Sequence, residues 1–132
     1  MILAAFANRF CHVNIFYIYQ AFQKRHLMNI ESLREYCISK KSVTESFPFD
    51  EETLVFKASG RIFALVSLEG ELSINLKCDP ALAIELRERY PAVTPGYHMN
   101  KKHWNTVVVD GSIPEKEIFS WIDHSYGLVM KK

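Results

Sequence analysis

The sequence TLVFKASGRIFALVSLEGELSINLK, residues 53–77, is the most informative part of this chain about its fold. Three apolar runs rich in Val, Ile, Leu and Phe are separated by a Ser-Gly pair at 59–60 and a Glu-Gly pair at 69–70. Such short connections are typical of β-hairpins, whose strands pair antiparallel. We therefore predict a three-stranded meander with one face that other elements must cover. The predicted strands are residues 53–58, 61–68 and 71–77.

Helix signals lie on both sides of this meander. Before it, Asn29 caps a helix predicted to run to about residue 41, with apolar residues at three- and four-residue spacing. After it, Asp79 caps a second helix that has Pro80 in its first turn and is predicted to end near Tyr90. Both helices are amphipathic, so each can bury one side against the meander.

The rest of the chain supplies more strands and a last helix. Extended segments are predicted at 93–97 and 104–109, with a polar stretch between them. In the last helix Ser112 is the predicted cap, and Glu115, three residues later, completes a capping box. The order of elements predicts an α+β fold in which helices pack on one face of an antiparallel sheet.

Composition describes an ordinary globular domain. The 132 residues fit one domain, and 16 basic against 15 acidic residues give a formal charge of +1. Residues 1–27 hold three basic residues and no acid, so 28–132 carry 13 basic and 15 acidic residues, a net −2. Three cysteines without paired spacing predict neither a disulfide framework nor a zinc site. We expect a reduced, monomeric protein of the cytoplasm.

Residues 1–27 differ from the rest of the sequence. Arg9 interrupts their apolar run, which is unlike a secretory signal, and the run is too short and too polar to span a membrane. Our preferred interpretation is that Met28 is the true start and that 1–27 is an extension outside the native protein. The alternative is an amphipathic helix that binds a surface or a partner, with Phe10, Ile15, Ile18 and Phe22 along one side.

Motifs for catalysis or cofactor binding are weak. The glycines form neither a GxGxxG nor a phosphate-binding loop, and no GxSxG nucleophile turn occurs. Cys37 falls on the buried stripe of its helix. Cys78 lies beside a helix cap, where a helix dipole can lower the pKa of a thiol. The candidate metal ligands are His98, His103, Asp123 and His124. Their spacing matches no compact metal-binding motif. We predict no enzyme activity, no cofactor and no metal.

Residues 97–105, YHMNKKHWN, are the one concentration of binding chemistry. Lys and His neutralise phosphate, Asn pairs with base edges, and Tyr or Trp stacks on bases. The meander adds the cations Lys57, Arg61 and Lys77. An alternative interpretation makes Tyr97 and Trp104 core residues and the Asn and His side chains partners of the loop backbone. The net charge of −2 argues against broad electrostatic binding.

The same region resembles the MmcQ/YjbR family. The resemblance is carried by RYPAVTPGYHMNKKHWNTV at 89–107 and covers essentially all of residues 28–132. Other matching motifs are Phe47-Pro48-Phe49, the hairpin from Lys57 through Gly60-Arg61-Ile62-Phe63-Ala64, Asp110-Gly111 and Ser125-Tyr126-Gly127-Leu128-Val129. Residues 1–27 have no counterpart in the family pattern.

The resemblance implies a small bacterial cytoplasmic protein with a CyaY-like, frataxin-like α+β fold and no enzyme activity. It also implies DNA binding through a double-wing arrangement of strands and loops. Frataxins bind iron through acidic ridges, whereas the first helix here offers only Glu31 and Glu35, so iron donation is not expected. The predicted DNA-contacting residues are Lys57, Arg61, Lys77, Asn100, Lys101, Lys102 and His103.

Two other functions remain open from the sequence. One is a module for a small ligand or a protein partner, with a pocket near Tyr97, His98 and Trp104. The other, less favoured, is an enzyme that uses Cys78 or the histidines. Cations gathered on one face would favour DNA, whereas a deep pocket beside His98 and Trp104 would favour a ligand.

Overall fold

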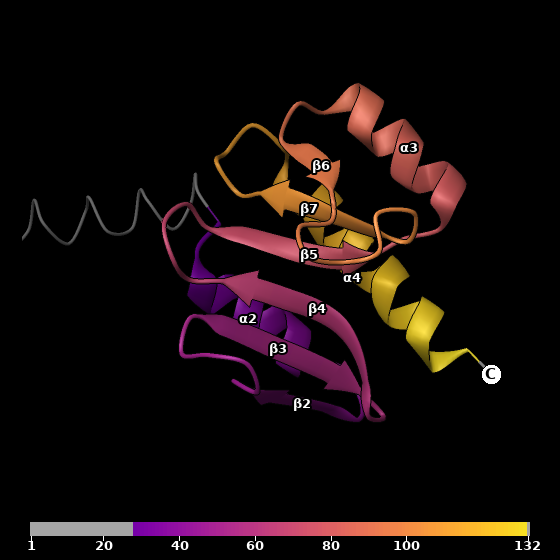
Figure 1. Cartoon of the computed structure of the whole chain (residues 1–132). Coiled ribbons are helices and arrows are strands. Elements are labelled where there is room, and N and C mark those ends of the chain that lie inside the picture. Colours follow the sequence, from indigo (N-terminus) through magenta and orange to yellow (C-terminus); the bar gives the residue numbers. More distant parts are fainter. Residues whose placement is uncertain (1–27, 132) are drawn as a thin grey trace, which may run out of the picture.

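The computed structural model describes residues 28–131, so the predictions for residues 1–27 lie outside the described part. The described chain folds into a six-stranded sheet and three helices (Figure 1). None of these helices is long and apolar enough to cross a membrane. The elements are α2 (Ile30–Ile38), β2 (Val43–Ser46), β3 (Thr53–Ala58), β4 (Arg61–Ser67), β5 (Ser73–Lys77), α3 (Pro80–Arg89), β6 (Val93–Pro95), β7 (Trp104–Val108) and α4 (Glu115–Met130).

The predicted meander forms the middle of the sheet. The strand order is β2-β3-β4-β5-β7-β6, and every neighbouring pair is antiparallel. The edge strand β2 was not expected, because four mostly polar residues carry little strand signal by themselves. It forms by pairing with β3, with Thr44 opposite Lys57. Tertiary pairing overrides weak local preference here.

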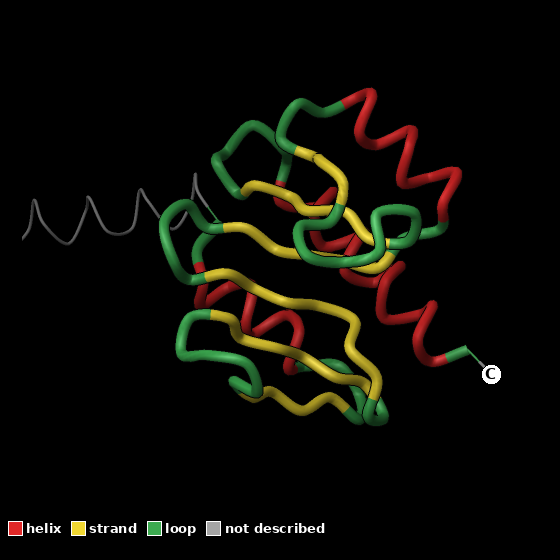
Figure 2. The backbone as a smooth tube through the Cα atoms, in the orientation of Figure 1, coloured by secondary structure: helices red, strands yellow, loops and turns green. Residues whose placement is uncertain are grey.

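All three helices contribute to one core on a single face of the sheet, and Figure 2 shows α2 and α4 behind the strands. Phe56, Phe63 and Ile74 point from the strands into a core that also receives Leu33 of α2 and Ile122 of α4. The helix α3 contributes Ala83 and Leu86 to the same core. The predicted α+β class, with helices on one face of an antiparallel sheet, is confirmed.

Two of the three predicted helix caps are present. Asn29 accepts a hydrogen bond from Ser32 N, and Asp79 accepts from the backbone amides of the first turn of α3. The third prediction is wrong, because α4 begins at Glu115 and has no side-chain cap. The Ser112 hydroxyl donates instead to Asp110 Oδ1 at 2.6 Å, within the turn that follows β7. The Ser112 hydroxyl bonds to the nearby Asp110 carboxylate and therefore does not cap the helix.

Candidate functional site

The sheet face opposite the helices carries a small apolar cluster of its own. Trp104, Val55 and Leu65 are buried there, and Ile62 and Met99 pack against them. Because successive side chains in a strand point to opposite faces, this cluster is separate from the helix-side core. Met99 belongs to the loop at residues 96–103, which connects β6 to β7. The loop therefore lies over part of this open face (Figures 1 and 2).

Backbone hydrogen bonds fix both ends of the 96–103 loop. Gly96 N donates to Trp104 O at 2.8 Å, and Tyr97 N donates to the hydroxyl of Thr106 at 2.9 Å. At the other end, Cys78 N donates to His103 O at 2.8 Å. The loop is thus joined to β7 and to the segment that leads into α3, and its side chains project from a defined backbone.

Arg87 of α3 holds the loop from the side, although no motif in the sequence singles it out. Its Nε donates to Asn105 Oδ1 at 2.7 Å, and its Nη2 donates to the carbonyls of Lys101 and Trp104. Asn105 is only 2% exposed and donates through Nδ2 to Ala83 O. The available signal was helical spacing, since Arg87 follows the buried Ala83 by four residues and so faces the sheet.

The predicted DNA-contacting cations do not all share one face. Lys57 stands opposite Ile62, and Lys77 stands opposite Trp104, so both lysines belong to the open face. They lie two strands apart, about 10 Å at ordinary strand spacing. Arg61 pairs with the core residue Ala58, and its Nη1 donates to the carbonyl of Val129 at the end of α4. Arg61 is therefore directed toward the helix side.

The polar residues of the loop divide into structural and free groups. The Asn100 side-chain oxygen accepts from the amides of Lys102 and His103, which closes a turn inside the loop. This agrees with the structural interpretation of the asparagine. Lys101 Nζ donates to Gly96 O at 3.0 Å, so its charge is held at the base of the loop. Lys102 is exposed, and His103 is half-buried.

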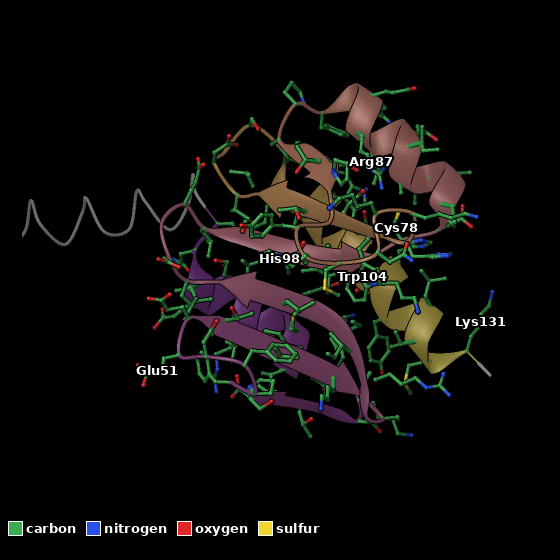
Figure 3. All side chains as sticks on the ribbon, viewed as in Figure 1. Glu51, Cys78, Arg87, His98, Trp104 and Lys131 are labelled. Carbon is green, nitrogen blue, oxygen red and sulfur yellow. The ribbon has the colours of Figure 1, made fainter. Side chains whose placement is uncertain are left out.

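The distribution of charge explains how a net-acidic body can present a basic surface. No acidic residue occupies an open-face position in the described strands, and residues 96–103 contain none either. Five of the fifteen acidic residues of 28–132 lie in two loops at the far end of the sheet, where Figure 3 labels Glu51. These two loops are residues 50–52 and 69–71, and seven further acidic residues lie in the three helices. The charged side chains at the described open-face positions of the strands are therefore all cationic.

Two of the residues expected to line a pocket, Tyr97 and Trp104, do not form its walls as predicted. Trp104 is 9% exposed and packed in its cluster, as the alternative core interpretation expected, whereas Tyr97 is 68% exposed. Two cavities of the described chain lie elsewhere. One of about 520 Å³ is lined by Met28, Ile30 and Leu72 among others, and one of about 320 Å³ lies beside Arg34 and Phe47.

Two of the candidate metal ligands, Asp123 and His124, have other partners. Asp123 accepts hydrogen bonds from the Tyr36 hydroxyl and from Lys40, and His124 Nε2 accepts from Asp79 N at 3.1 Å. Among the described residues, no three His, Cys, Asp or Glu side chains are grouped so as to hold a metal ion. These side chains serve the packing of α4 against α2 and the start of α3.

Burial has the opposite effect on Cys78 from the lowering considered in the sequence analysis. Desolvation raises the pKa of the Cys78 thiol to about 11, with the nearby charge of Asp79 adding to the shift. Burial likewise raises the pKa of Cys37 to about 12. Both thiols are therefore protonated in the folded protein near neutral pH, and neither is a prepared nucleophile.

We expect the free energy of unfolding to fall as the pH rises above about 9. The unfolded chain releases its thiol protons near pH 9, whereas the folded chain keeps them until about pH 11 or 12. The folded state then binds more protons, and stability decreases with pH. Urea unfolding across this range tests the prediction, and Cys78→Ser should make the decrease shallower. A decrease of unchanged steepness in that variant would contradict the assignment to Cys78.

Comparisons with known proteins agree with this architecture. Residues 38–128 match the YjbR family. The chain is 37% identical over 100 residues to the uncharacterised YjbR protein of Escherichia coli K12, an alignment that covers 75% of this chain and 85% of that one. It is 40% identical over 101 residues to the uncharacterised YbdF protein of Escherichia coli O157:H7, covering 76% and 83% of the two chains.

Solved structures show the same fold. The crystal structure of Deinococcus radiodurans protein DR2400, described with the domain DUF419, superposes with a TM-score of 0.76 at 42% identity, covering 80% of this chain and 81% of that one. A Pseudomonas syringae protein superposes with a TM-score of 0.68 at 32% identity, covering 76% and 98%. The family match spans most of the described chain, and sequence and structure agree along it. This chain is a member of the YjbR family.

Proposed function

We propose that this protein is a non-enzymatic, cytoplasmic DNA-binding protein whose contact surface is the open sheet face together with the 96–103 loop. The observation that carries the proposal is the separation of charge. Lys57 and Lys77 project from the open face, Lys101 and Lys102 lie in the loop, and acidic residues are absent from the same described positions. Lysines placed in this way attract phosphates even when the whole body is acidic.

The geometry also assigns different roles to the predicted residues. Lys57, Lys77 and Lys102 contact phosphates directly, because their charges stand on the exposed side of the sheet and loop. Asn100 shapes the turn that presents Lys102, and His103 continues that turn. Arg61 drops out of the contact set, because it is turned to the helix side, where it holds the end of α4.

The test is fluorescence-anisotropy binding of labelled DNA across a salt series. We expect saturable binding that weakens with salt, and Lys57→Ala/Lys77→Ala should reduce the slope of log affinity against log salt by up to about 2, because each lost phosphate contact removes roughly 0.9. Lys101→Ala/Lys102→Ala should reduce the slope by about 0.9, because of these two lysines only Lys102 contacts a phosphate directly. Thermal unfolding of each variant checks that the fold persists.

A matched control removes two exposed cations from the helices. Lys116 of α4 and Arg89 of α3 are both exposed and lie on the helix side of the sheet, so Arg89→Ala/Lys116→Ala changes the net charge as much as Lys57→Ala/Lys77→Ala. We expect a much smaller loss of affinity from this control. Equal losses from the two double variants would show that only net charge matters and would reject the open face as the contact surface. Absence of binding at low salt would reject DNA binding altogether.

A further inference from the structure

Tyr97 is exposed in a way that its packing does not require. Its side chain is 68% exposed, although the preceding Gly96 is buried and Met99 of the same loop packs on the cluster around Trp104. A large aromatic surface left in water forgoes the free energy that burial provides. Single exposed aromatic side chains are common at protein surfaces, so a contact with a partner is inferred only where the neighbouring groups suit that partner.

The backbone around Tyr97 is constrained on both sides. Gly96 N and Tyr97 N each donate a hydrogen bond to β7, at 2.8 and 2.9 Å, which seats the start of the loop on the sheet. His98 adopts a φ of 60°, a left-handed conformation that is uncommon for a residue with a side chain. This backbone brings the His98 and Tyr97 rings together, with centroids 4.0 Å apart and planes tilted by 50°. Figure 3 labels His98 in front of the sheet.

Positive charge lies beside this pair of rings. Lys101 Nζ is bonded to the carbonyl of Gly96, the residue directly before Tyr97. Lys77 stands beside Trp104 on the strand next to the loop base. An exposed aromatic ring with lysines next to it is the pairing by which proteins bind unpaired nucleotides, because the ring stacks on a base while the lysines neutralise its phosphates.

We propose that the DNA ligand of this face is single-stranded, and that an unpaired base stacks on Tyr97. This inference rests on the proposed DNA binding and adds the form of the ligand. In a duplex the faces of the bases are covered by their stacked neighbours, so Tyr97 has nothing to stack on. A single strand exposes them, and the open sheet face then follows its phosphates with Lys57 and Lys77.

The experiment compares three labelled probes with the full chain: a short oligothymidylate, an abasic deoxyribose-phosphate strand of the same length, and a duplex of the same length. We expect oligothymidylate to bind roughly tenfold more tightly than the abasic strand, which corresponds to ~1.4 kcal/mol from one stacked base. We also expect oligothymidylate to bind more tightly than the duplex. Tyr97→Ala should abolish the preference for bases and leave the affinity for the abasic strand unchanged, while Tyr97→Phe should preserve the preference.

Phe49 provides the matched control. It is 66% exposed, close to the value for Tyr97, and it lies in the loop after the edge strand β2, at the other side of the sheet from β6. Phe49→Ala should leave the preference for bases intact. Equal affinity for oligothymidylate and the abasic strand, tighter binding of the duplex, or a preference that survives in Tyr97→Ala would overturn the stacking proposal while DNA binding stood. Absence of binding to all three probes would reject both.

Discussion

Replacing Arg87 with Met is expected to destabilise the protein by about 2–3 kcal/mol, a large effect for one side chain of a half-buried helix residue. The guanidinium joins Asn105 Oδ1 to the backbone carbonyls of Lys101 and Trp104. Met fills similar space but donates no hydrogen bond. The Asn105 oxygen, in a side chain that is 2% exposed, then loses a charged donor in a place that water hardly reaches.

The measurement is urea unfolding of the single variants and the double variant. Asn105→Ala removes the acceptor that Arg87→Met leaves unpaired. The double variant should therefore lose less free energy of unfolding than the sum of the losses in the two single variants. Arg89→Met, two residues further along α3, is the control. Arg89 makes a surface ion pair with Glu85, for which we expect about 0.5 kcal/mol or less. Strict additivity of the Arg87 and Asn105 variants would contradict the proposed coupling.

Arg87 also connects the fold to the proposed DNA contact. It holds the carbonyl of Lys101 within the loop, so its loss should loosen the segment that carries Lys101 and Lys102. Weaker DNA binding is expected in Arg87→Met at a temperature where the fold is intact. Arg87→Lys keeps the charge but lacks the planar set of donors, and it should resemble Met more than Arg in stability.

Alanine substitutions at two glycines are expected to act in opposite directions. A Cβ at Gly96 would lie 2.7 Å from Trp104 Cβ and 3.1 Å from Trp104 O. The strand backbone cannot retreat without disturbing the β6–β7 pair, so Gly96→Ala should cost about 1–3 kcal/mol. A Cβ at Gly127 meets nothing within 4 Å inside α4, and Gly127→Ala should stabilise by about 0.5–1 kcal/mol through helix propensity.

Thermal and urea unfolding of the two variants provide the measurement. The contrast is informative because the chemical change is the same at both positions and only the surroundings differ. Gly96→Ala should also shift Trp104 fluorescence, since the added methyl presses on that side chain. A stable Gly96→Ala variant with unchanged fluorescence would show that β6 and β7 approach each other less closely than described.

Much of this fold could be predicted from local sequence signals. The meander at 53–77 followed from two Gly-containing turns, and the helices after Asn29 and Asp79 followed from capping side chains and apolar spacing. Those signals act over a few residues and need no distant partner. The predictions that failed involve competition between neighbours or across strands. Asp110 captured the Ser112 hydroxyl, and β2 formed because β3 offered it a ladder.

The sequence predicted only part of the candidate site. The sequence picked out residues 97–105 by their concentration of Lys, His, Asn and aromatic residues. It could not show that Arg61 faces the helices while Lys57 and Lys77 face away from them, since the bulge between Phe56 and Lys57 changes the register of that hairpin. Nor could it reveal Arg87, whose partners lie 14 to 18 residues along the chain.

The sequence by itself determined the fold class, the family and the position of the candidate loop, because turns, caps, apolar periodicity and short motifs are local properties of the chain. Only the tertiary structure decided which cations share a surface. Net charge is a sum over all residues, and the sum of −2 hides a basic open face opposite acidic loops and helices. Which face a strand residue occupies depends on register and bulges. These in turn depend on pairing between segments that are far apart in the sequence.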